Sequence, residues 1–329
     1  MGSDSSVIAG IQRVIALKSA YNIRVMNLSL GRPVYESYKS DPLCQAVEQA
    51  WKAGIVVVVA AGNEGRNSVN GTNGYGTITS PGNDPYVITV GAMKSMGTPS
   101  RGDDRIASYS AKGPTLIDHV VKPDLVAPGN RVVSWAYTSN LYQLYVDNRV
   151  GPGYLSLSGT SMAAPVVSGA ASLLLQKNPS LTPDMVKARL MKTASKDFPA
   201  YSIATDANTN QTFTSQYDLF TIGAGYVDVW AALNNTDLVP SGKWALSPGA
   251  VYDAATRTVK VANTLSGVSA VWGDSAVWGS SAVWGSTVFV NGSSAVWGDH
   301  TTNGFSAVWG DSAIWGTTTT TSTEKPRAC

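Results

Sequence analysis

The run of apolar residues at 55–61 constrains the fold more than any other segment of the chain. It consists of one isoleucine, four valines and two alanines, and it follows a helical pattern at 41–53. Consecutive β-branched residues of this kind are typical of a strand buried on both faces, and the run is too short to cross a bilayer. Strand patterns at 25–30 and 86–92 also alternate with helical ones. The sequence therefore predicts an α/β domain with a mostly parallel sheet over residues 1–236.

The composition excludes several classes of function. Hydrophobic residues make up 43% of the chain and charged residues 14%, which is typical of a globular protein with a sizeable core. A net charge of +2 gives no basic surface for nucleic acid, and no segment is apolar for long enough to be transmembrane. The two cysteines, Cys44 and Cys329, form neither a disulfide framework nor a metal-binding spacing. We expect Cys44 to be a small buried thiol. The first residues contain no signal-peptide pattern.

The composition changes after the predicted domain. We expect a linker at 237–268, a repeat region at 269–316 and a disordered tail at 317–329. In the repeat region Ser-Ala-Val-Trp-Gly recurs, most often every six residues, which would place the tryptophans on one face of an extended strand. Both a repeating β structure and a weakly ordered low-complexity tail are compatible with this pattern. Aromatic faces stack on sugars and on proteins, so contact with a cell surface through this Trp-rich tail is a hypothesis.

A helix is predicted to begin near Pro183. Thr182 is a suitable N-cap, Pro183 suits the first helical position, and Asp184 places a negative charge in the first turn. We expect this helix to lie on the surface because its polar face carries three basic residues. They are Lys187, Arg189 and Lys192.

Ser161 is the candidate nucleophile. It lies in Gly-Thr-Ser-Met-Ala-Ala-Pro at 159–165 and opens a helical pattern that carries no charge until Lys177. A serine at the amino terminus of a helix lies where backbone N–H groups are unpaired and the helix dipole is positive. Such a position can hold a developing oxyanion. The position alone favours a plain N-cap serine over a nucleophile.

Five segments, in the same order along the chain, resemble the subtilisin-like serine proteases, or subtilases. The segment at 159–165 is similar to the nucleophile motif of that family, and Val-Ala-Ala-Gly-Asn-Glu-Gly at 59–65 is similar to the segment with the oxyanion-hole asparagine. Asn-Leu-Ser-Leu-Gly at 27–31 resembles the strand that pairs with substrate. Two further blocks lie at 108–114 and 122–129. The resemblance implies a subtilisin-like three-layer fold that is incomplete at its amino terminus.

The resemblance also implies the chemistry. The enzyme would be a serine endopeptidase that hydrolyses peptide bonds through an acyl-enzyme at Ser161, with the side chain of Asn63 in the oxyanion hole. Its partners would be polypeptide substrates, and its location would be extracellular or at the cell surface. No cofactor would be required. Calcium is common in the family, but the sequence contains no clustered carboxylate ligand set, so we predict no metal site.

Two short segments would bind the substrate. One would pair with the peptide by strand addition, and the other would form the wall of the pocket for the residue before the cleaved bond. These residues are Ser29, Leu30 and Gly31 for the strand, and Ala60, Ala61 and Gly62 for the wall.

The base that would activate the serine is missing. In the family an aspartate and a histidine precede the serine, but neither Asp-Thr-Gly, Asp-Ser-Gly nor His-Gly-Thr-His occurs before Ser161. We expect His119 to be an exposed loop residue and Asp124 to belong to a structural turn, while His300 lies among the repeats. The chain alone should therefore be close to inert, and the strand at 25–30 should have an uncovered edge.

Three interpretations of the function are compatible with the sequence. The first is a catalytically incomplete serine endopeptidase. The second is a pseudoprotease or peptide-binding module that does not cleave. The third is a hydrolase of another class such as an esterase, and the absence of Gly-x-Ser-x-Gly argues against it.

Overall fold

The computed structural model describes residues 2–67, 72–236 and 244–253, together with short strands farther along the chain. These strands are β11 Thr258–Ala262, β12 Val288–Phe289, β13 Ser294–Trp297, β14 His300–Thr302 and β15 Thr321–Glu324. Most of the predicted repeat region and tail, and Cys329, lie outside the described residues. The predictions for these segments therefore stay predictions.

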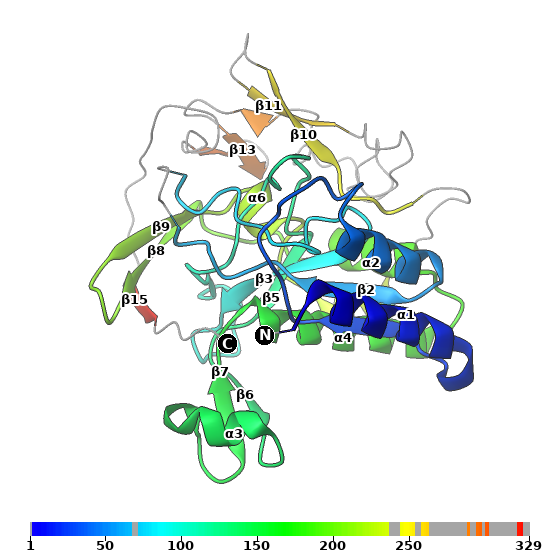
Figure 1. The fold of residues 1–329 in the computed structure, drawn as a ribbon. Coiled ribbons are helices and arrows are strands. Elements are labelled where there is room, and N and C mark those ends of the chain that lie inside the picture. Colours follow the sequence, from blue (N-terminus) through cyan, green and yellow to red (C-terminus); the bar gives the residue numbers. More distant parts are fainter. Residues whose placement is uncertain are drawn as a thin grey trace.

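A mixed, mostly parallel sheet forms the centre of the molecule (Figure 1). Its four parallel strands have the order β1-β2-β3-β5, and a short strand, β4, pairs antiparallel with the end of β3. The strands are β1 Val25–Leu28, β2 Val56–Ala60, β3 Ile88–Lys94, β4 Arg105–Ile106 and β5 Leu125–Pro128. The predicted fold class is confirmed. Within the described part of the chain β1 pairs only with β2, so the other edge of β1 is open, as expected.

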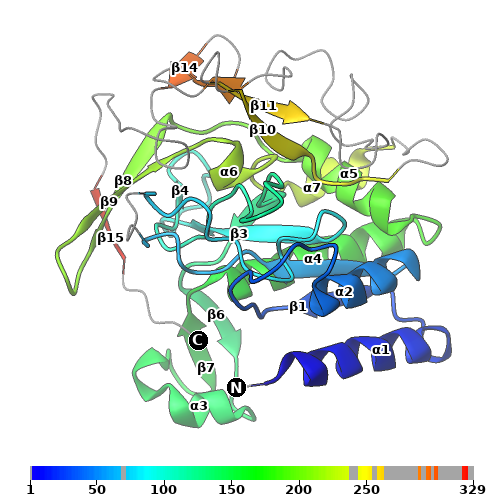
Figure 2. The same cartoon turned by 45° about the horizontal axis from the view of Figure 1, so that its top comes forward.

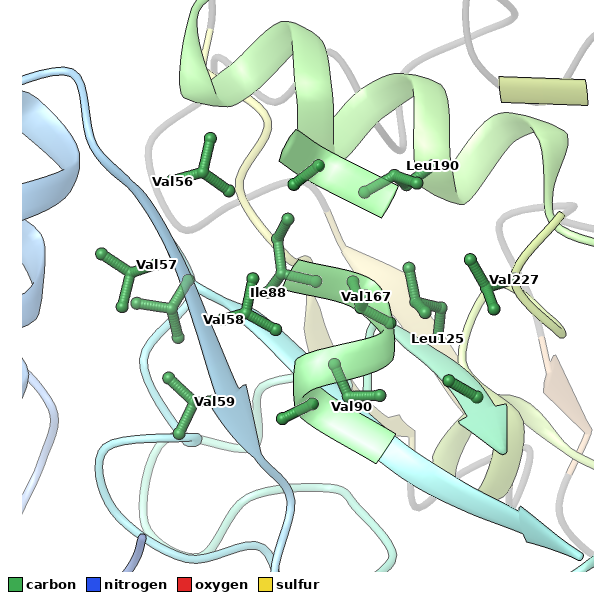
Figure 3. Packing of buried hydrophobic residues seen from close by; sticks show 14 of the residues in the cluster. Val56, Val57, Val58, Val59, Ile88, Val90, Leu125, Val167, Leu190 and Val227 are labelled. Atoms are coloured by element: carbon green, nitrogen blue, oxygen red, sulfur yellow. The ribbon is translucent and has the colours of Figure 1, made fainter. Parts of the chain in front are cut away.

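Helices cover the two faces of this sheet. The long helix α4 packs across all four parallel strands. Helix α2 packs on β2, and α1 packs on α2. Figure 3 shows the alternation along β2: Val58 points toward α4, and Val57 and Val59 point to the other side. Every residue of β2 is buried, which explains why this strand is continuously apolar. The helices are α1 Asp4–Tyr21, α2 Pro42–Lys52, α4 Thr160–Lys177 and α5 Pro183–Thr193. Cys44 on α2 is fully buried, as predicted.

The remaining elements surround this core. The hairpin of β6 and β7, with α3 at its tip, projects away from the body (Figure 2). The hairpin of β8 and β9 lies on another side, and β15 pairs with β8. These elements are β6 Val132–Trp135, α3 Asn140–Leu144, the 3-10 helix Val146–Asn148, β7 Tyr154–Leu157, β8 Tyr201–Asp206, β9 Thr212–Gln216, α6 Leu219–Ile222, α7 Val229–Asn234 and β10 Gly249–Asp253. None of the described helices combines the length and the apolarity that a membrane crossing requires.

Helix α5 begins as predicted but does not lie on the surface as we expected. The Thr182 side chain caps the helix by accepting a hydrogen bond from the Met185 N–H. The expectation about the basic residues was wrong, because Lys187 is completely buried and Arg189 is 7% exposed. The Lys187 ammonium group donates to the carbonyl oxygens of Pro85 and Val87, at 2.8 and 3.0 Å. The spacing of basic residues along a helix does not show whether their charges will be solvated by water or paired with buried groups.

A cluster of buried charges, which we call the Asp124 cluster, joins α5 to the sheet. The Asp124 carboxylate accepts from Lys122 Nζ at 2.7 Å, lies 3.2 Å from Lys187 Nζ, and accepts from the Ser247 hydroxyl. All four side chains are completely buried. Burial alone would raise the pKa of Asp124, but the two ammonium groups hold it below its ordinary value. Asp124 is therefore a structural residue, as predicted.

Residues 244–253 fall in the range where we expected a linker, and they pack against the domain. The buried residues Ala245 and Ser247 are tied to it by their backbone N–H groups, which donate to the Asp184 carboxylate and to the Pro85 carbonyl. Farther along, the Ala250 N–H donates to the carbonyl of His119 at 2.7 Å. His119 does lie in a loop, but it is half-buried beneath this segment instead of exposed.

Candidate active site

The candidate nucleophile lies in a tight turn that leads from β7 into α4. We call residues 159–161 the nucleophile turn. Gly159 has a φ of 155°, which side-chain-bearing residues rarely adopt, and its N–H donates to the Gly129 carbonyl at 2.8 Å. Thr160 is buried and Ser161 is partly exposed. The sequence prediction that Ser161 lies in the first turn of a helix is confirmed.

Asn63 lies directly against this turn and is held there by Thr160. The Asn63 Oδ1 atom accepts from the Thr160 N–H at 2.9 Å and lies 3.1 Å from the Thr160 hydroxyl. The same hydroxyl accepts from the Gly62 N–H at 3.1 Å. Because Oδ1 faces Thr160, the orientation of the carboxamide is fixed, and its Nδ2 donor lies on the side of Gly159. Sequence reasoning did not assign this role to Thr160, although its place next to Ser161 was a signal.

The end of β1 is joined to the same turn. The Ser29 hydroxyl donates to the Ser161 carbonyl at 2.7 Å and accepts from the Asn27 side chain at 2.8 Å. Asn27 in turn accepts from Ser168, farther along α4, at 3.0 Å. The Ser161 hydroxyl lies 3.5 Å from the Ser29 carbonyl. The structure therefore brings the predicted substrate strand, the predicted oxyanion-hole asparagine and the candidate nucleophile together.

The predicted pocket wall follows β2. Ala60 ends the strand, Ala61 is fully buried, and Gly62 has a φ of 113°, a conformation that favours glycine. Gly62 and Gly31, from the two predicted substrate-binding segments, both face the side chain of Thr79. Sequence reasoning missed Thr79, because it lies 17 residues after Gly62 and 48 after Gly31.

The site residues and His119 belong to different segments of the chain. Ser29 and Asn63 follow the carboxyl ends of β1 and β2, and parallel strands have their carboxyl ends at the same edge of a sheet. His119 lies in the loop before β5, where its N–H donates to the Thr115 carbonyl and its carbonyl accepts from the Ala250 N–H. The only other histidine of the chain is His300, which lies in β14. Among the residues that the structure describes, no group of three or more His, Cys, Asp or Glu side chains is arranged to hold a metal ion.

Comparison with known proteins decides the family. The family model described as "Subtilase family" matches residues 1–225. The chain belongs to the subtilase family. Serine protease AprX of Bacillus subtilis (strain 168) is 46% identical over 177 residues, which is 53% of this chain and 38% of that protein. Subtilisin DY of Bacillus licheniformis is 37% identical over 193 residues, which is 59% of this chain and 56% of the relative.

Two further similarities agree with this membership. The Extracellular serine proteinase of a Thermus species (strain Rt41A) is 37% identical over 190 residues, covering 58% of this chain and 37% of that protein. Among solved structures, Sphericase matches with a TM-score of 0.50 and 28% identity, covering 69% of this chain and 64% of its own. This subtilase chain thus spans between 37% and 56% of the length of these three curated relatives.

Proposed function

We propose that this subtilase chain supplies the nucleophile and part of the substrate cleft of a serine endopeptidase. The observation that carries the proposal is the nucleophile turn, in which Ser161 is bonded to the substrate strand through Ser29 and Thr160 is bonded to Asn63. A plain N-cap serine needs neither connection. The family membership supports a serine-type endopeptidase.

The proposed reaction is acyl transfer to water. The Ser161 Oγ atom attacks the carbonyl carbon of the scissile peptide bond, and the negative charge that develops on the carbonyl oxygen is bound by the Ser161 N–H and Asn63 Nδ2. The C–N bond then breaks and the protonated amine leaves. Water hydrolyses the ester on Ser161 and releases the second product. Polypeptides bind as a strand added to the backbone of residues 29–31.

The proton acceptor for Ser161 has to come from outside the described residues. The family resemblance assigns it to a histidine that is oriented by an aspartate, and neither motif precedes Ser161 in this chain. The open edge of β1 adjoins the nucleophile turn through Ser29, so a strand added there would lie next to Ser161. We therefore propose that the chain alone is inactive. In subtilisin itself, removal of the catalytic histidine costs roughly a millionfold in rate.

The family membership also supports proposals about the location of the protein and about bound ions. An extracellular location is supported by the relative that is named an extracellular proteinase. Calcium is a structural ion in some members of the family, without a candidate ligand group among the described residues. Contact with a cell surface through the Trp-rich repeats is an additional proposal. It predicts weaker retention on cells when residues 240–329 are deleted from an active enzyme.

The test is casein cleavage by the chain alone and by the chain joined to a subtilase amino-terminal segment that carries the aspartate and the histidine. We expect cleavage only by the joined protein, and none after Ser161→Ala. A joined protein that folds and binds peptides, but never cleaves them, would favour the pseudoprotease. Cleavage that survives Ser161→Ala would contradict the proposed nucleophile.

A further inference from the structure

Arg66 lies three residues after Asn63 and connects this part of the chain to the β8–β9 hairpin. Its guanidinium group forms an ion pair with the Asp206 carboxylate at the end of β8. The same group lies over the ring of Phe213 on β9, with Cζ 4.9 Å from the ring centroid. Arg66 Nε also donates to the Ser108 hydroxyl at 2.7 Å. Donors of one rigid, planar group are thus bound by two different segments.

This connection is largely shielded from water. The Arg66 side chain is 14% exposed and the Asp206 side chain 7%, and Ser108 is buried. The Asp206 carboxylate is held in turn, because it accepts from the backbone N–H groups of Asn208 and Thr209 in the hairpin turn. Shielded pairs are screened by salt much less than exposed ones. Arg66 and Asp206 therefore form a fixed link between the hairpin and the segment of Asn63.

The backbone between Arg66 and Asn63 has little freedom to absorb a movement. The Gly65 N–H and the Gly62 carbonyl are both bonded to the backbone of residues 109–111, at 2.8 and 3.0 Å. These two bonds bracket Asn63, and Arg66 directly follows the second of them. A displacement of Arg66 would therefore reach Asn63 through only two intervening residues.

We propose that Arg66 is a positioning residue of the oxyanion hole, and that the β8–β9 hairpin acts on the reaction through it. This inference rests on the proposed function, because it assumes that Asn63 Nδ2 binds the oxyanion. Such a donor has to lie about 2.7–3.1 Å from the developing oxyanion, so a small displacement of Asn63 weakens the bond in the transition state. Binding of the peptide backbone to residues 29–31 does not need this donor.

The kinetics of the joined protein described above test the proposal. We expect Arg66→Ala to lower kcat by about 10–100-fold, as a remote substitution does when it displaces a catalytic group, with little change in KM. The decisive comparison is made in the Asn63→Ala background. A residue that acts only through the Asn63 carboxamide has nothing left to position there, so Arg66→Ala should lower kcat no further.

Amide exchange tests the same inference on the chain alone, without catalysis. The Thr160 N–H donates to Asn63 Oδ1 at 2.9 Å, so its exchange with solvent, measured by NMR, reports how firmly the carboxamide is held. In Arg66→Ala this amide should exchange about 10-fold faster, while the amides of β2 and β3 should exchange at the native rate. Equal acceleration of all these amides would assign Arg66 to stability alone and overturn the proposal.

Two milder variants keep the test decisive if Arg66→Ala impairs folding. Asp206→Asn places an NH₂ group against Arg66 but keeps the oxygen that accepts from the hairpin turn, and it should lower kcat by less than Arg66→Ala does. Arg66→Lys keeps the charge but loses the planar fork, so it should retain part of the activity that Arg66→Ala loses.

Arg101→Ala is the matched control. Arg101 also pairs with an aspartate, Asp228, at 2.8 Å, and its guanidinium group lies 5.8 Å from the ring centroid of Tyr226. It follows Asn63 by 38 residues instead of three. The variant should retain the native kcat and the native exchange rate of the Thr160 amide.

The different failures can be told apart. An equal further loss of kcat in the Asn63→Ala background, or an unchanged kcat in both Arg66→Ala and Asp206→Asn, would overturn the role of Arg66 and leave the proposed function intact. If the joined protein with native Arg66 does not cleave casein, the proposed function is refuted, and the inference about Arg66 falls with it.

Discussion

The Asp124 cluster and the nucleophile turn are both assembled from polar groups that distant segments bring together, but they differ in burial and in charge. The four side chains of the Asp124 cluster are completely buried and three of them are charged. The groups around Ser161 are neutral, and they are linked by hydrogen bonds between small side chains and the backbone. Thr160 is buried, but Ser161 and Asn63 are partly exposed. A buried charge without a partner destabilises the fold, whereas a catalytic site must remain accessible to its substrate. We therefore expect substitutions in the first region to change stability and those in the second to change activity.

Removal of the carboxylate at the centre of the Asp124 cluster should have the largest effect. Asp124→Ala leaves the ammonium groups of Lys122 and Lys187 buried and unpaired, so the free energy of unfolding should fall by about 3–5 kcal/mol. Denaturant titration measures this change. Glu48→Ala is the matched control, since the partly exposed Glu48 pairs with the more exposed Lys52 one turn along α2, and it should cost less than about 1 kcal/mol. Equal losses in the two variants would remove the distinction between the regions.

At Asn63 we expect a loss of activity with little loss of stability. In the protein completed with the missing base, Asn63→Ala should lower kcat by roughly 10²–10³-fold, because one oxyanion donor is lost, a magnitude taken from the equivalent subtilisin substitution. The free energy of unfolding should change by less than about 1 kcal/mol, since Asn63 is partly exposed. A large loss of stability with unchanged kcat would assign Asn63 to the structure instead of the reaction.

Buried charge should also determine how stability depends on pH. Burial raises the pKa of Asp218 to about 6, although Tyr75 and the helix α6 N–H groups donate to it and Lys112 lies nearby. The unfolded value is about 3.9. The folded state therefore binds more protons between these values, and the stability that this group contributes is present below about pH 4 and lost as the pH rises through about 6.

Asp218→Asn should remove this dependence. Between pH 4 and 7 the free energy of unfolding of the native chain should fall, relative to the variant, by roughly 1–3 kcal/mol. Denaturant titrations at several pH values measure the difference. Asp228 is the control, because its pKa is lowered in the folded state and its contribution to stability should therefore be lost as the pH falls. Its slight burial is outweighed by the Ala231 N–H and by Arg101, which lower its pKa. If the difference in free energy of unfolding between the native chain and Asp218→Asn does not change with pH, the pKa of Asp218 is not raised by folding.

The smallest of these effects is expected for Thr160. Thr160→Val keeps the volume but removes the hydroxyl that accepts from the Gly62 N–H, and it leaves the Thr160 N–H to hold Asn63. We expect a loss of about 1 kcal/mol of stability and a loss of activity smaller than that of Asn63→Ala. An activity loss as large as that of Asn63→Ala would mean that the hydroxyl itself acts on the oxyanion.

The two regions also differ in how well the sequence predicted them. The apolar runs predicted three of the four parallel strands, β1, β2 and β3, and the motif around Ser161 predicted the nucleophile turn, because each signal lies within one continuous segment. The burial of Lys187 could not be foreseen, since its partners lie in segments about 60 and 100 residues away. Thr79 was missed for the same reason. Long-range packing decides these positions, and a single sequence does not reveal it.

The central claim is that Ser161 is a nucleophile that lacks only its base. A fluorescent diphenyl phosphonate, followed by mass spectrometry of the modified peptide, tests this claim directly. In the protein joined to the aspartate- and histidine-bearing segment, the label should be found on Ser161, and the chain alone should label at least about 1,000-fold more slowly. Rapid labelling of the chain alone, or labelling of the joined protein at a residue other than Ser161, would contradict the claim.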